Sequence, residues 1–493
     1  MQPIPKEQVL NRVRAENPWW STPGQIHSEY RDLKPRAYLN LLYPLVTNLG
    51  VRRAVLLMGP RRVGKTVLIH HVIQQLLKTP VDPRRICYFS VDHPIYNGLS
   101  LEQLLEYFWE ASGAKDRGAP GFIFFDEIQY LKGWEIHLKA LVDSQRKIRF
   151  VASGSAAAAL RLKSTESGAG RFTDFLLPPL TFHEYLELKG EKNLIEVVES
   201  AEESDAGFRS PDLVALNHSF IHYLNFGGYP EVIFSPSAQA DPVRFIKSDI
   251  IDKVLLRDLP SLYGIQDIQE LNYLFTTLAF NTANEVSLSE LASNSGVAKN
   301  TLKKYIEYLE AAFLVRVVHR IDRNCRRFRR ANFFKVYLTN PSIRSALFSP
   351  IQEDDPNMGS LAETAIFSQW FHGPSQPYYA RWAGGEVDMV YLDERQKPAW
   401  AVEVKWSDRF FERPEELNSL ISFCLKNNVD DTLVTTRTKE GKTVVKNVHV
   451  TFIPASVYCF TVGYNHLLAK GLHAGRIGKR KRHSRSGQRR TEG

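Results

Sequence analysis

The sequence predicts an α/β protein whose first domain is built on a doubly wound parallel sheet. Three observations carry this prediction: short unbroken apolar runs, helical patterns between them, and a glycine-rich turn directly after the first run. Strands buried on both faces of a sheet are nearly continuous apolar segments, and helices between them are typical of crossover connections. The 493 residues leave room for about three domains at ~150 residues each, so further domains are expected.

The elements of the first domain follow in order from these runs. A helix over 38–52 leads into the strand "RAVLLMG", and later strands are expected at 86–92, 121–127, 148–155 and 172–178. Helical stretches separate them at about 65–78, 101–112 and 134–146. We therefore expect this domain over 38–190, behind an N-terminal extension over 1–37.

Composition limits the compartment and the partners. The chain lacks an apolar run near the ~18–20 residues that span a bilayer, and its N-terminus lacks the apolar stretch of a secretory signal. Its four cysteines are scattered, without metal or disulfide spacing. We expect a cytoplasmic protein without a membrane partner and without structural zinc.

The net charge of +9 is concentrated at the C-terminal end of the sequence. Residues 475–493 hold eight Lys/Arg and one Glu, and they contain almost no apolar side chains. Such a segment is expected to be disordered, and its charge suits phosphate backbones. The alternative is a solvated end without a partner.

The segment 59–66, "GPRRVGKT", matches the phosphate-binding loop pattern G-x-x-x-x-G-K-[ST], between a strand and a helix as the pattern requires. Glycines let backbone amides approach phosphates, and the helix N-terminus adds a partial positive charge. Lys65 is expected to reach the β- and γ-phosphates, and Thr66 to hold Mg²⁺. ATP and Mg²⁺ are therefore the predicted ligands, bound by Gly59, Pro60, Arg61, Arg62, Val63, Gly64, Lys65 and Thr66.

Two acids close the apolar run "FIFFDE" at 122–127. A buried strand delivers Asp126 and Glu127 to the carboxyl edge of the sheet, where ligands of open α/β sheets bind. Asp126 is expected to hold Mg²⁺ through water, and Glu127 to polarise the attacking water as a catalytic residue. Ser153 and Ser155 close the next strand and are candidate sensors of the γ-phosphate, with simple turn chemistry as the alternative.

Arg171, in "GAGRFTDF", is a candidate for stabilising the transferred charge, in its own subunit or in a neighbouring one of a homo-oligomer. A surface arginine is the alternative.

These motifs resemble a known family. "GPRRVGKT", "FIFFDEIQ", "ASGS", "AGRFTDFLLPPLTFHEYL" and "GGYPEV" occur in this order in a group of prokaryotic AAA+-superfamily ATPases. The similarity extends from about Asn17 to about residue 460. It implies ATP binding, a winged-helix element and a restriction-endonuclease-like terminal fold, without a settled biological substrate.

An acidic linker and helical region are expected over 191–267, and a helix-turn-helix unit of winged-helix type over 268–340. Basic and polar residues gather at the start of its second helix, where DNA-binding units meet nucleic acid: Lys299, Asn300, Thr301, Lys303 and Lys304. "RNCRRFRRANFFK" (323–335) adds six more basic residues. We predict nucleic-acid binding, with a packing module and a solvated face as the alternative.

A last α/β domain is expected over 359–460. Its segment "WAVEVKW" carries Glu403 and Lys405 on one strand face, and Asp388 precedes Glu403 by 15 residues, enough for a hairpin that pairs the two acids. This order resembles the D-(x)14-E-x-K motif of PD-(D/E)xK nucleases, which hold Mg²⁺ with carboxylates and use the lysine on the reacting phosphate. Glu363, on a helical stretch, is a further candidate metal ligand, and Glu386 shares the face of Asp388. A surface ion pair is the alternative.

The sequence therefore predicts a P-loop ATPase that acts on nucleic acid through a Mg²⁺-dependent, nuclease-like terminal domain. The catalytic candidates there are Asp388, Glu403 and Lys405. The alternative is an ATP-gated switch that binds nucleic acid or a partner without cleaving it. A protein remodeller is a third possibility that rests on analogy alone.

Overall fold

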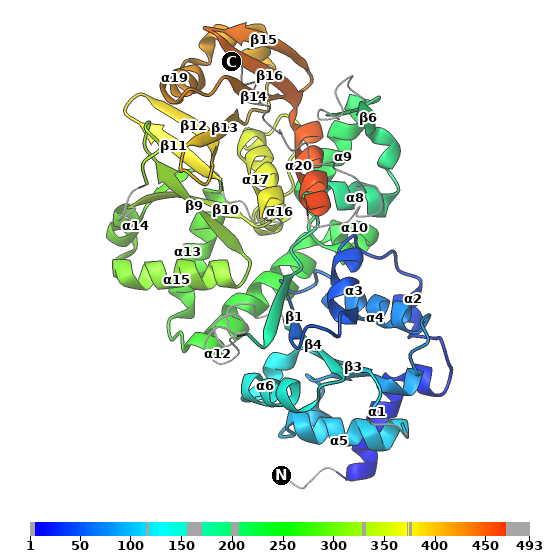
Figure 1. Cartoon of the computed structure of the whole chain (residues 1–493). Coiled ribbons are helices and arrows are strands. Elements are labelled where there is room, and N and C mark those ends of the chain that lie inside the picture. The colour runs from blue at the N-terminus through cyan, green and yellow to red at the C-terminus, as the bar shows by residue number, and fades with distance from the viewer. Residues whose placement is uncertain are drawn as a thin grey trace, which may run out of the picture.

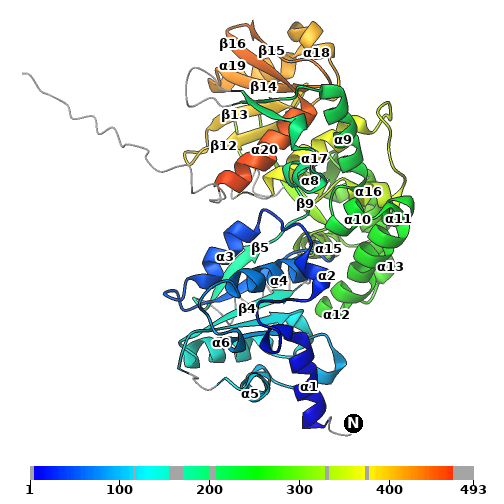
Figure 2. The same ribbon diagram turned by 90° about the vertical axis from the view of Figure 1, so that its right-hand side faces the viewer.

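Two lobes make up the molecule, and helices join them along one side (Figures 1 and 2). The computed structural model describes residues 5–114, 118–154, 170–198, 207–327, 332–371, 373 and 377–469. The N-terminal lobe holds a five-stranded sheet and the C-terminal lobe a nine-stranded sheet. Helices α10 (Pro230–Phe234) to α13 (Ile268–Phe280) extend between the lobes at one side (Figure 2).

The N-terminal sheet is wholly parallel, in the order β2-β3-β4-β1-β5. Its strands are β1 (Ala54–Met58), β2 (Ile86–Ser90), β3 (Gly121–Asp126), β4 (Ile148–Gly154) and β5 (Phe172–Leu176). Every residue of β1 and of β3 is buried, because helices cover both faces of the sheet. The predicted α/β fold is confirmed for this lobe.

The two faces of β1 belong to separate cores. Leu56 and Met58 pack with α1 (Lys6–Glu16), α5 (Leu101–Ser112) and α6 (Trp134–Ser144), whereas Val55 and Leu57 pack with α3 (Leu39–Thr47) and α4 (Lys65–Leu76). The alternation of side chains along a strand produces this division. The helix expected over 38–52 is shorter, since α3 ends at Thr47 and a turn through Gly50 follows.

The chain enters the C-terminal lobe soon after β5. Helix α8 (Phe182–Lys189) falls within the domain expected over 38–190, yet it packs beside α9 (Leu213–Phe226) and α20 (Ala455–Ala469). Its apolar residues Phe182, Tyr185 and Leu186 are fully buried there, which explains the placement. The expected linker contains a short antiparallel pair, β6 (Glu196–Val198) with β7 (Gly207–Arg209).

One sheet spans the C-terminal lobe, in the order β15-β16-β14-β13-β12-β11-β9-β10-β8. Its strands are β8 (Glu285–Ser287), β9 (Val315–Ile321), β10 (Phe333–Leu338), β11 (Tyr378–Trp382), β12 (Gly385–Leu392), β13 (Pro398–Glu403), β14 (Asp431–Thr436), β15 (Gly441–Val445) and β16 (Val448–Pro454). Parallel pairing of β9 with β11 joins the segments expected as separate units over 268–340 and 359–460. The two segments are therefore continuous in the sheet.

A helix-turn-helix precedes β9. Helix α14 (Leu288–Ser295) ends at Gly296, whose φ of +73° favours glycine, and α15 (Lys299–Ala311) follows. Strands β8, β9 and β10 form an antiparallel sheet beside these helices.

Across the described ranges, no helix combines the length and the apolar character that a membrane crossing requires. The four cysteines Cys87, Cys325, Cys424 and Cys459 are buried and free. The basic tail over 475–493 lies outside the described residues.

Candidate functional site

The phosphate loop connects the C-terminal end of β1 to α4, and its backbone depends on glycine at two positions. A Cβ on Gly59 would lie 2.2 Å from the carbonyl oxygen of Leu177, and Gly64 has a φ of +94°. Arg62 also has a positive φ, of 61°. A loop in this conformation turns backbone amides toward a common centre at the helix N-terminus, which favours an anion.

Lys65 folds back over the loop. Its Nζ donates to the carbonyl oxygens of Gly59 at 3.1 Å and Pro60 at 2.8 Å, and the side chain is buried. Burial lowers the pKa of Lys65, while the nearby Glu127 and Asp126 oppose that effect. A phosphate group in the loop would supply a stronger partner for this ammonium than two carbonyls.

Asp126 ends β3 beside Thr66. The Thr66 hydroxyl donates to Asp126 Oδ2 at 2.6 Å, Tyr88 Oη donates to the same oxygen at 2.9 Å, and Ser153 Oγ donates to Oδ1. Burial, and then the adjacent Glu127, raise the pKa of Asp126. An adjoining hydroxyl and carboxylate fit Mg²⁺, which takes few protein ligands and fills its shell with water and phosphate oxygens.

Tyr88 was missed from sequence, because it lies on the neighbouring strand within an unbroken apolar run. The register pairs β2 with β3 from Ile86 and Phe122 to Ser90 and Asp126. The contact of Tyr88 with Asp126 could have been predicted only from that strand pairing.

Glu127 follows Asp126 in an unusual conformation. Its φ of +56° lies in the left-handed region, which non-glycine residues rarely adopt. Ser153 Oγ accepts from the Glu127 amide at 3.2 Å, and Gln129 donates to its carboxylate. Backbone strain of this kind is often found at active sites. Ser155, the other serine predicted here, lies outside the described residues.

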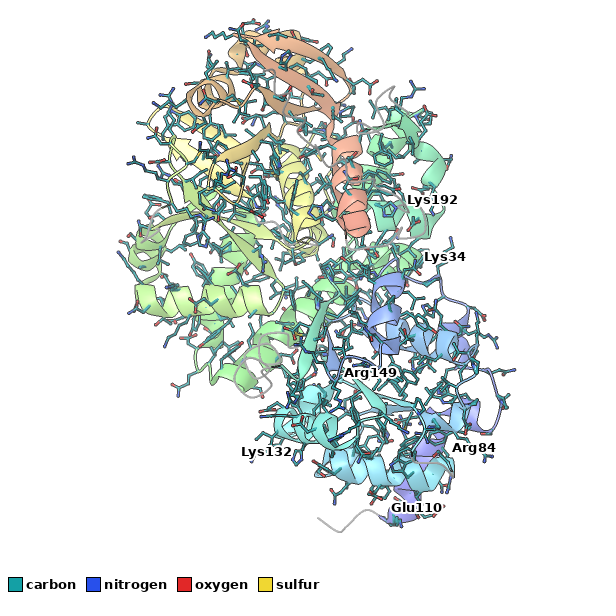
Figure 3. All side chains as sticks on the ribbon, viewed as in Figure 1. Lys34, Arg84, Glu110, Lys132, Arg149 and Lys192 are labelled. Atoms are coloured by element: carbon teal, nitrogen blue, oxygen red, sulfur yellow. The ribbon has the colours of Figure 1, made fainter. Side chains whose placement is uncertain are left out.

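A cavity of about 600 Å³ opens beside Lys65, Thr66 and Glu127. His71 of α4 and residues far from the phosphate loop in sequence complete its wall. Sequence reasoning did not find any of these residues, of which the distant ones are Lys34, Leu188, Pro230, Phe234, Asp249 and Lys253. Lys34 Nζ donates to the carbonyl of Leu188 at 2.9 Å where the lobes meet (Figure 3). Six cationic and three anionic side chains line the cavity, so its charge balance suits a polyanion.

Arg61 and Arg62 link the loop to the following helical segment. Arg61 forms a bidentate ion pair with Asp258 of η7 (Val254–Asp258), at 2.8 and 2.9 Å. Arg62 contacts Glu231 of α10 at 2.5 Å and Asp249 of η6 (Val243–Asp252) at 2.9 Å. The loop is therefore anchored by three acids from outside the N-terminal sheet.

Arg171 is not part of this site. It precedes β5, and its carbonyl accepts from the amide of Ala54 at the start of β1, whereas the phosphate loop follows the end of β1. Its guanidinium pairs with Asp143. Since the strands are parallel, Arg171 lies at the opposite edge of the sheet, and the expectation that it contacts the nucleotide of its own chain does not fit this geometry.

The three motif residues of the C-terminal lobe lie together. Antiparallel pairing of Met389 with Val402 brings Asp388 next to Glu403. Lys405 Nζ lies 2.9 Å from Asp388 Oδ2 and 2.8 Å from Glu403 Oε1, and the Val404 amide donates to Asp388 at 3.0 Å. These contacts are internal rather than on the surface, since Asp388 is buried.

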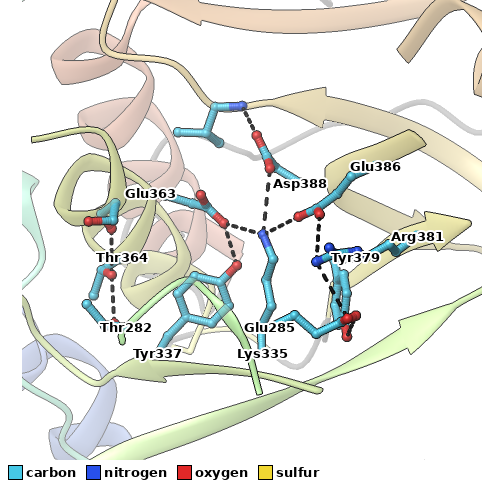
Figure 4. Close-up of polar contacts among 12 residues, drawn as sticks. Thr282, Glu285, Lys335, Tyr337, Glu363, Thr364, Tyr379, Arg381, Glu386 and Asp388 are labelled. Atoms are coloured by element: carbon cyan, nitrogen blue, oxygen red, sulfur yellow. Dashed lines mark hydrogen bonds and ion pairs between the residues drawn. The ribbon is translucent and has the colours of Figure 1, made fainter. Parts of the chain in front are cut away.

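Lys335 of β10 occupies the middle of this arrangement (Figure 4). Its Nζ lies 3.0 Å from Glu363, 2.8 Å from Glu386 and 3.6 Å from Asp388. We call the four carboxylates Glu363, Glu386, Asp388 and Glu403 the acid cluster. The sequence interpretation assigned Lys335 to a basic surface for nucleic acid; this was wrong, because only 4% of its side chain is exposed.

Burial and the two lysines, Lys335 and Lys405, shift the pKa values of the acid cluster. Burial raises the pKa of Glu363 and of Glu403 to about 7. Burial acts in the same direction on Asp388, but the Lys405 and Lys335 ammoniums outweigh it and lower the pKa of Asp388. Tyr337 Oη donates to Glu363 at 2.6 Å.

As arranged, the acid cluster does not fit the Mg²⁺ set expected from Asp388, Glu403 and Glu363. An ammonium holds the position between Glu363, Glu386 and Asp388 where a shared cation would lie. Within the described ranges, no group of three or more histidine, cysteine or acidic side chains has the arrangement of a metal site.

The cations expected to meet nucleic acid divide into two sets. Lys299, Asn300, Lys303 and Lys304 are exposed at the start of α15, and Thr301 is half-buried. Arg326 and Arg327 are also exposed, and Arg327 lies over the Tyr378 ring at 4.7 Å, whereas Arg323 is half-buried and donates to Ser422 of α19 (Asn418–Asn427). Residues 328–331 lie outside the described residues.

Comparison with known families matches two parts of the chain. Residues 51–186 match a family described as an AAA domain, and residues 217–355 match a domain of unknown function (DUF8612). An uncharacterized protein of Methanocaldococcus jannaschii is 24% identical over 351 residues, covering 69% of this chain and 72% of that protein. An uncharacterized protein of Haemophilus influenzae is 23% identical over 410 residues, covering 80% and 92%.

Solved structures with similarity include a Walker-type ATPase of Pyrococcus abyssi, 14% identical, which covers 64% of this chain and 99% of its own with a TM-score of 0.35. The ORC2 protein of Aeropyrum pernix, in ADPNP–ADP complexes, is 14% identical, covering 64% and 95% with a TM-score of 0.37. The N-terminal lobe thus combines a match to an AAA domain over residues 51–186 with a five-stranded parallel sheet that matches the core of a P-loop ATPase.

Proposed function

We propose that this protein binds and hydrolyses ATP with Mg²⁺ in the cavity beside Lys65. The carrying observation is that Lys65, Thr66 and Glu127 line one cavity whose charged lining is mostly cationic, and that Asp126 contacts Thr66 directly. The cavity volume of about 600 Å³ lies within the ~300–1,000 Å³ range of small-molecule sites. The AAA family match supports the same activity.

The chain's own residues have distinct roles in this proposal. Backbone amides of the loop and Lys65 bind the phosphates, and Glu127 orients the attacking water from its strained position. Thr66 and Asp126 would hold Mg²⁺, which neutralises charge on the phosphate oxygens when bound. For Arg171 the proposal leaves a role in trans, on the nucleotide of a neighbouring copy, or a surface position.

Two variants test the assignment. Lys65→Ala is expected to abolish nucleotide binding and turnover, whereas Glu127→Gln should retain binding and lose hydrolysis. Binding of a fluorescent ATP analogue and release of phosphate measure the two properties separately. Persistent hydrolysis in Lys65→Ala would contradict the proposed site.

We further propose that the C-terminal lobe contacts nucleic acid in a manner set by the nucleotide. The exposed lysines at the start of α15 support contact with phosphates. The ion pairs of Arg61 and Arg62 supply a physical connection between the ATP site and the segment that precedes α13. On this basis the protein is an ATP-gated switch that binds without cleaving.

A Mg²⁺-dependent nuclease is the second candidate, favoured by the proximity of Asp388, Glu403 and Lys405. It requires Lys335 to leave the acid cluster, because the present arrangement does not fit the metal. A nicking assay with wild type, Lys405→Ala and Lys335→Ala separates the candidates. Cleavage that needs Lys405 supports the nuclease; the same result for wild type and Lys405→Ala supports the switch.

A further inference from the structure

Asp249 joins two cations that come from different regions of the chain. One of its oxygens lies 2.9 Å from Nη2 of Arg62 in the phosphate loop, and the other lies 2.7 Å from Nζ of Lys253. All three side chains line the cavity that also contains Lys65 and Thr66. The Asp249 carboxylate therefore holds a guanidinium and an ammonium together beside the proposed ATP site, and Glu231 is a second acidic partner of the Arg62 guanidinium.

The groups are accessible enough to exchange partners. The exposed fractions of the side chains are 37% for Arg62, 43% for Lys253 and 28% for Asp249. Exposed ion pairs are worth only ~0–1 kcal/mol, whereas a phosphate accepts several charge-assisted hydrogen bonds. The hydrogen bond from Lys253 is the main reason why the pKa of Asp249 is lowered, so the carboxylate is charged near neutral pH.

The backbone at Lys253 is also unusual. It lies between two π-helical stretches, η6 and η7, and π-helical turns are frequent at functional sites. The same segment carries Asp258, the partner of Arg61. The segment that carries Lys253 is thus attached to the phosphate loop at two points, Asp249 with Arg62 and Asp258 with Arg61.

We propose that Arg62 and Lys253 form a binding pair for the terminal phosphate of ATP, and that Asp249 competes with this phosphate for both cations. ATP displaces the carboxylate, and the segment over 243–258 changes its contacts with the loop. ADP, which lacks the terminal phosphate, leaves the Asp249 contacts in place. This inference rests on the proposed ATP site and assigns the group that distinguishes ATP from ADP.

The competition predicts opposite effects of two substitutions. Asp249→Asn removes the competitor, so the affinity for ATP should increase about fivefold, as expected for the loss of a partly exposed ion pair. Lys253→Ala should weaken ATP about tenfold and ADP by less than about twofold, because a charge-assisted contact to the terminal phosphate is lost. Lys253→Arg should restore the preference for ATP.

The same segment offers a matched control. Lys247 and Asp252 form an ion pair at 2.9 Å on η6, and neither is among the residues that line the cavity. Lys247→Ala and Asp252→Asn should bind both nucleotides as wild type does. Equilibrium titration of the full-length proteins with fluorescent ATP and ADP analogues, in Mg²⁺, measures all of these affinities.

Three outcomes decide the matter. Opposite shifts for Asp249→Asn and Lys253→Ala, selective for ATP, support the inference. Equal weakening of ATP and ADP by Lys253→Ala, or unchanged affinities in both variants, overturns it while the proposed ATP site stands. If wild type binds neither nucleotide, the proposed site and this inference both fail.

Discussion

The proposed nucleotide site and the acid cluster both combine lysines with carboxylates, but the lysines of the two sites have different partners. At the nucleotide site, Lys65 is held by two backbone carbonyls beside a cavity of about 600 Å³. In the acid cluster, Lys335 and Lys405 are held by carboxylates at 2.8–3.0 Å. A lysine bound by neutral carbonyls can gain a stronger anionic partner, whereas one already surrounded by acids cannot. Lys65 is therefore expected to bind an anionic ligand, whereas Lys335 and Lys405 are not.

The acid cluster is also part of a larger network that is nearly neutral. Glu285 contacts Arg320 at 3.6 Å. It also contacts Arg381 at 3.5 Å, and Arg381 contacts Glu386 at 3.2 Å (Figure 4). Five acids meet four cationic side chains here, if each is counted at its formal charge. The network connects β10, α17 (Met358–Trp370), β12 and β13, so it holds the two segments of the large sheet together.

The largest expected effect that tests the contrast between the two sites is the loss of ATP hydrolysis in Lys65→Met. Lys65→Met keeps an apolar stem and removes the ammonium, so ATP turnover should decrease by at least about 100-fold, as for loss of a charged transition-state contact. Its free energy of unfolding should change less than in the acid cluster, because the Lys65 ammonium is hydrogen-bonded to two neutral carbonyls and not to a carboxylate. Steady-state phosphate release and urea unfolding measure the two quantities; a large loss of stability would remove the contrast.

Lys335→Met should instead lower the stability and leave ATP turnover nearly unchanged. It leaves the buried Glu363 without its cation, while Glu386 keeps Arg381, and the loss should cost about 3–5 kcal/mol of unfolding free energy, as for a broken buried ion pair. ATP turnover should remain close to wild type. Unfolding in urea checks the first value, and a cost below about 1 kcal/mol would show that the network is not structural.

The pKa of about 7 for Glu363 and Glu403 predicts a dependence of stability on pH. The folded state binds these protons more tightly than the unfolded chain, so their contribution is complete below about pH 4.5 and is lost as pH rises through about 7. Glu363→Gln removes one titration, and its unfolding free energy should decrease less from pH 5 to 8. The exposed Glu394→Gln is the control, and parallel curves for Glu363→Gln and wild type would be the contrary result.

The smallest expected change in stability is at α15. Lys303 and Glu307 form an exposed pair at 4.0 Å, so Lys303→Ala should alter the unfolding free energy by less than about 0.5 kcal/mol. Lys303→Ala should nevertheless weaken the affinity for duplex DNA and reduce the dependence of that affinity on salt concentration. Fluorescence anisotropy at several salt concentrations measures this, and an unchanged salt slope would exclude α15 from the nucleic-acid surface.

The sequence predicted those residues of both sites that lie close together in the chain. The phosphate loop is one contiguous motif, and Asp388 and Glu403 lie on a hairpin whose length fixed their pairing. Tyr88, Asp249 and Lys253 come from distant segments without a motif, so only the tertiary arrangement reveals them. Lys335 did carry a signal, since it interrupts the apolar strand "FFKVYL", and a lysine buried in such a strand needs acidic partners. The basic residues just before it directed the interpretation to the surface instead.

The most direct test of this account is a pair of calorimetric titrations of the wild-type chain, one with ATP in Mg²⁺ and one with Mg²⁺ alone. The account predicts saturable binding of ATP and no saturable binding of Mg²⁺ alone at low millimolar concentration. Tight binding of Mg²⁺ alone that disappears in Asp388→Asn, or no binding of ATP, would contradict it.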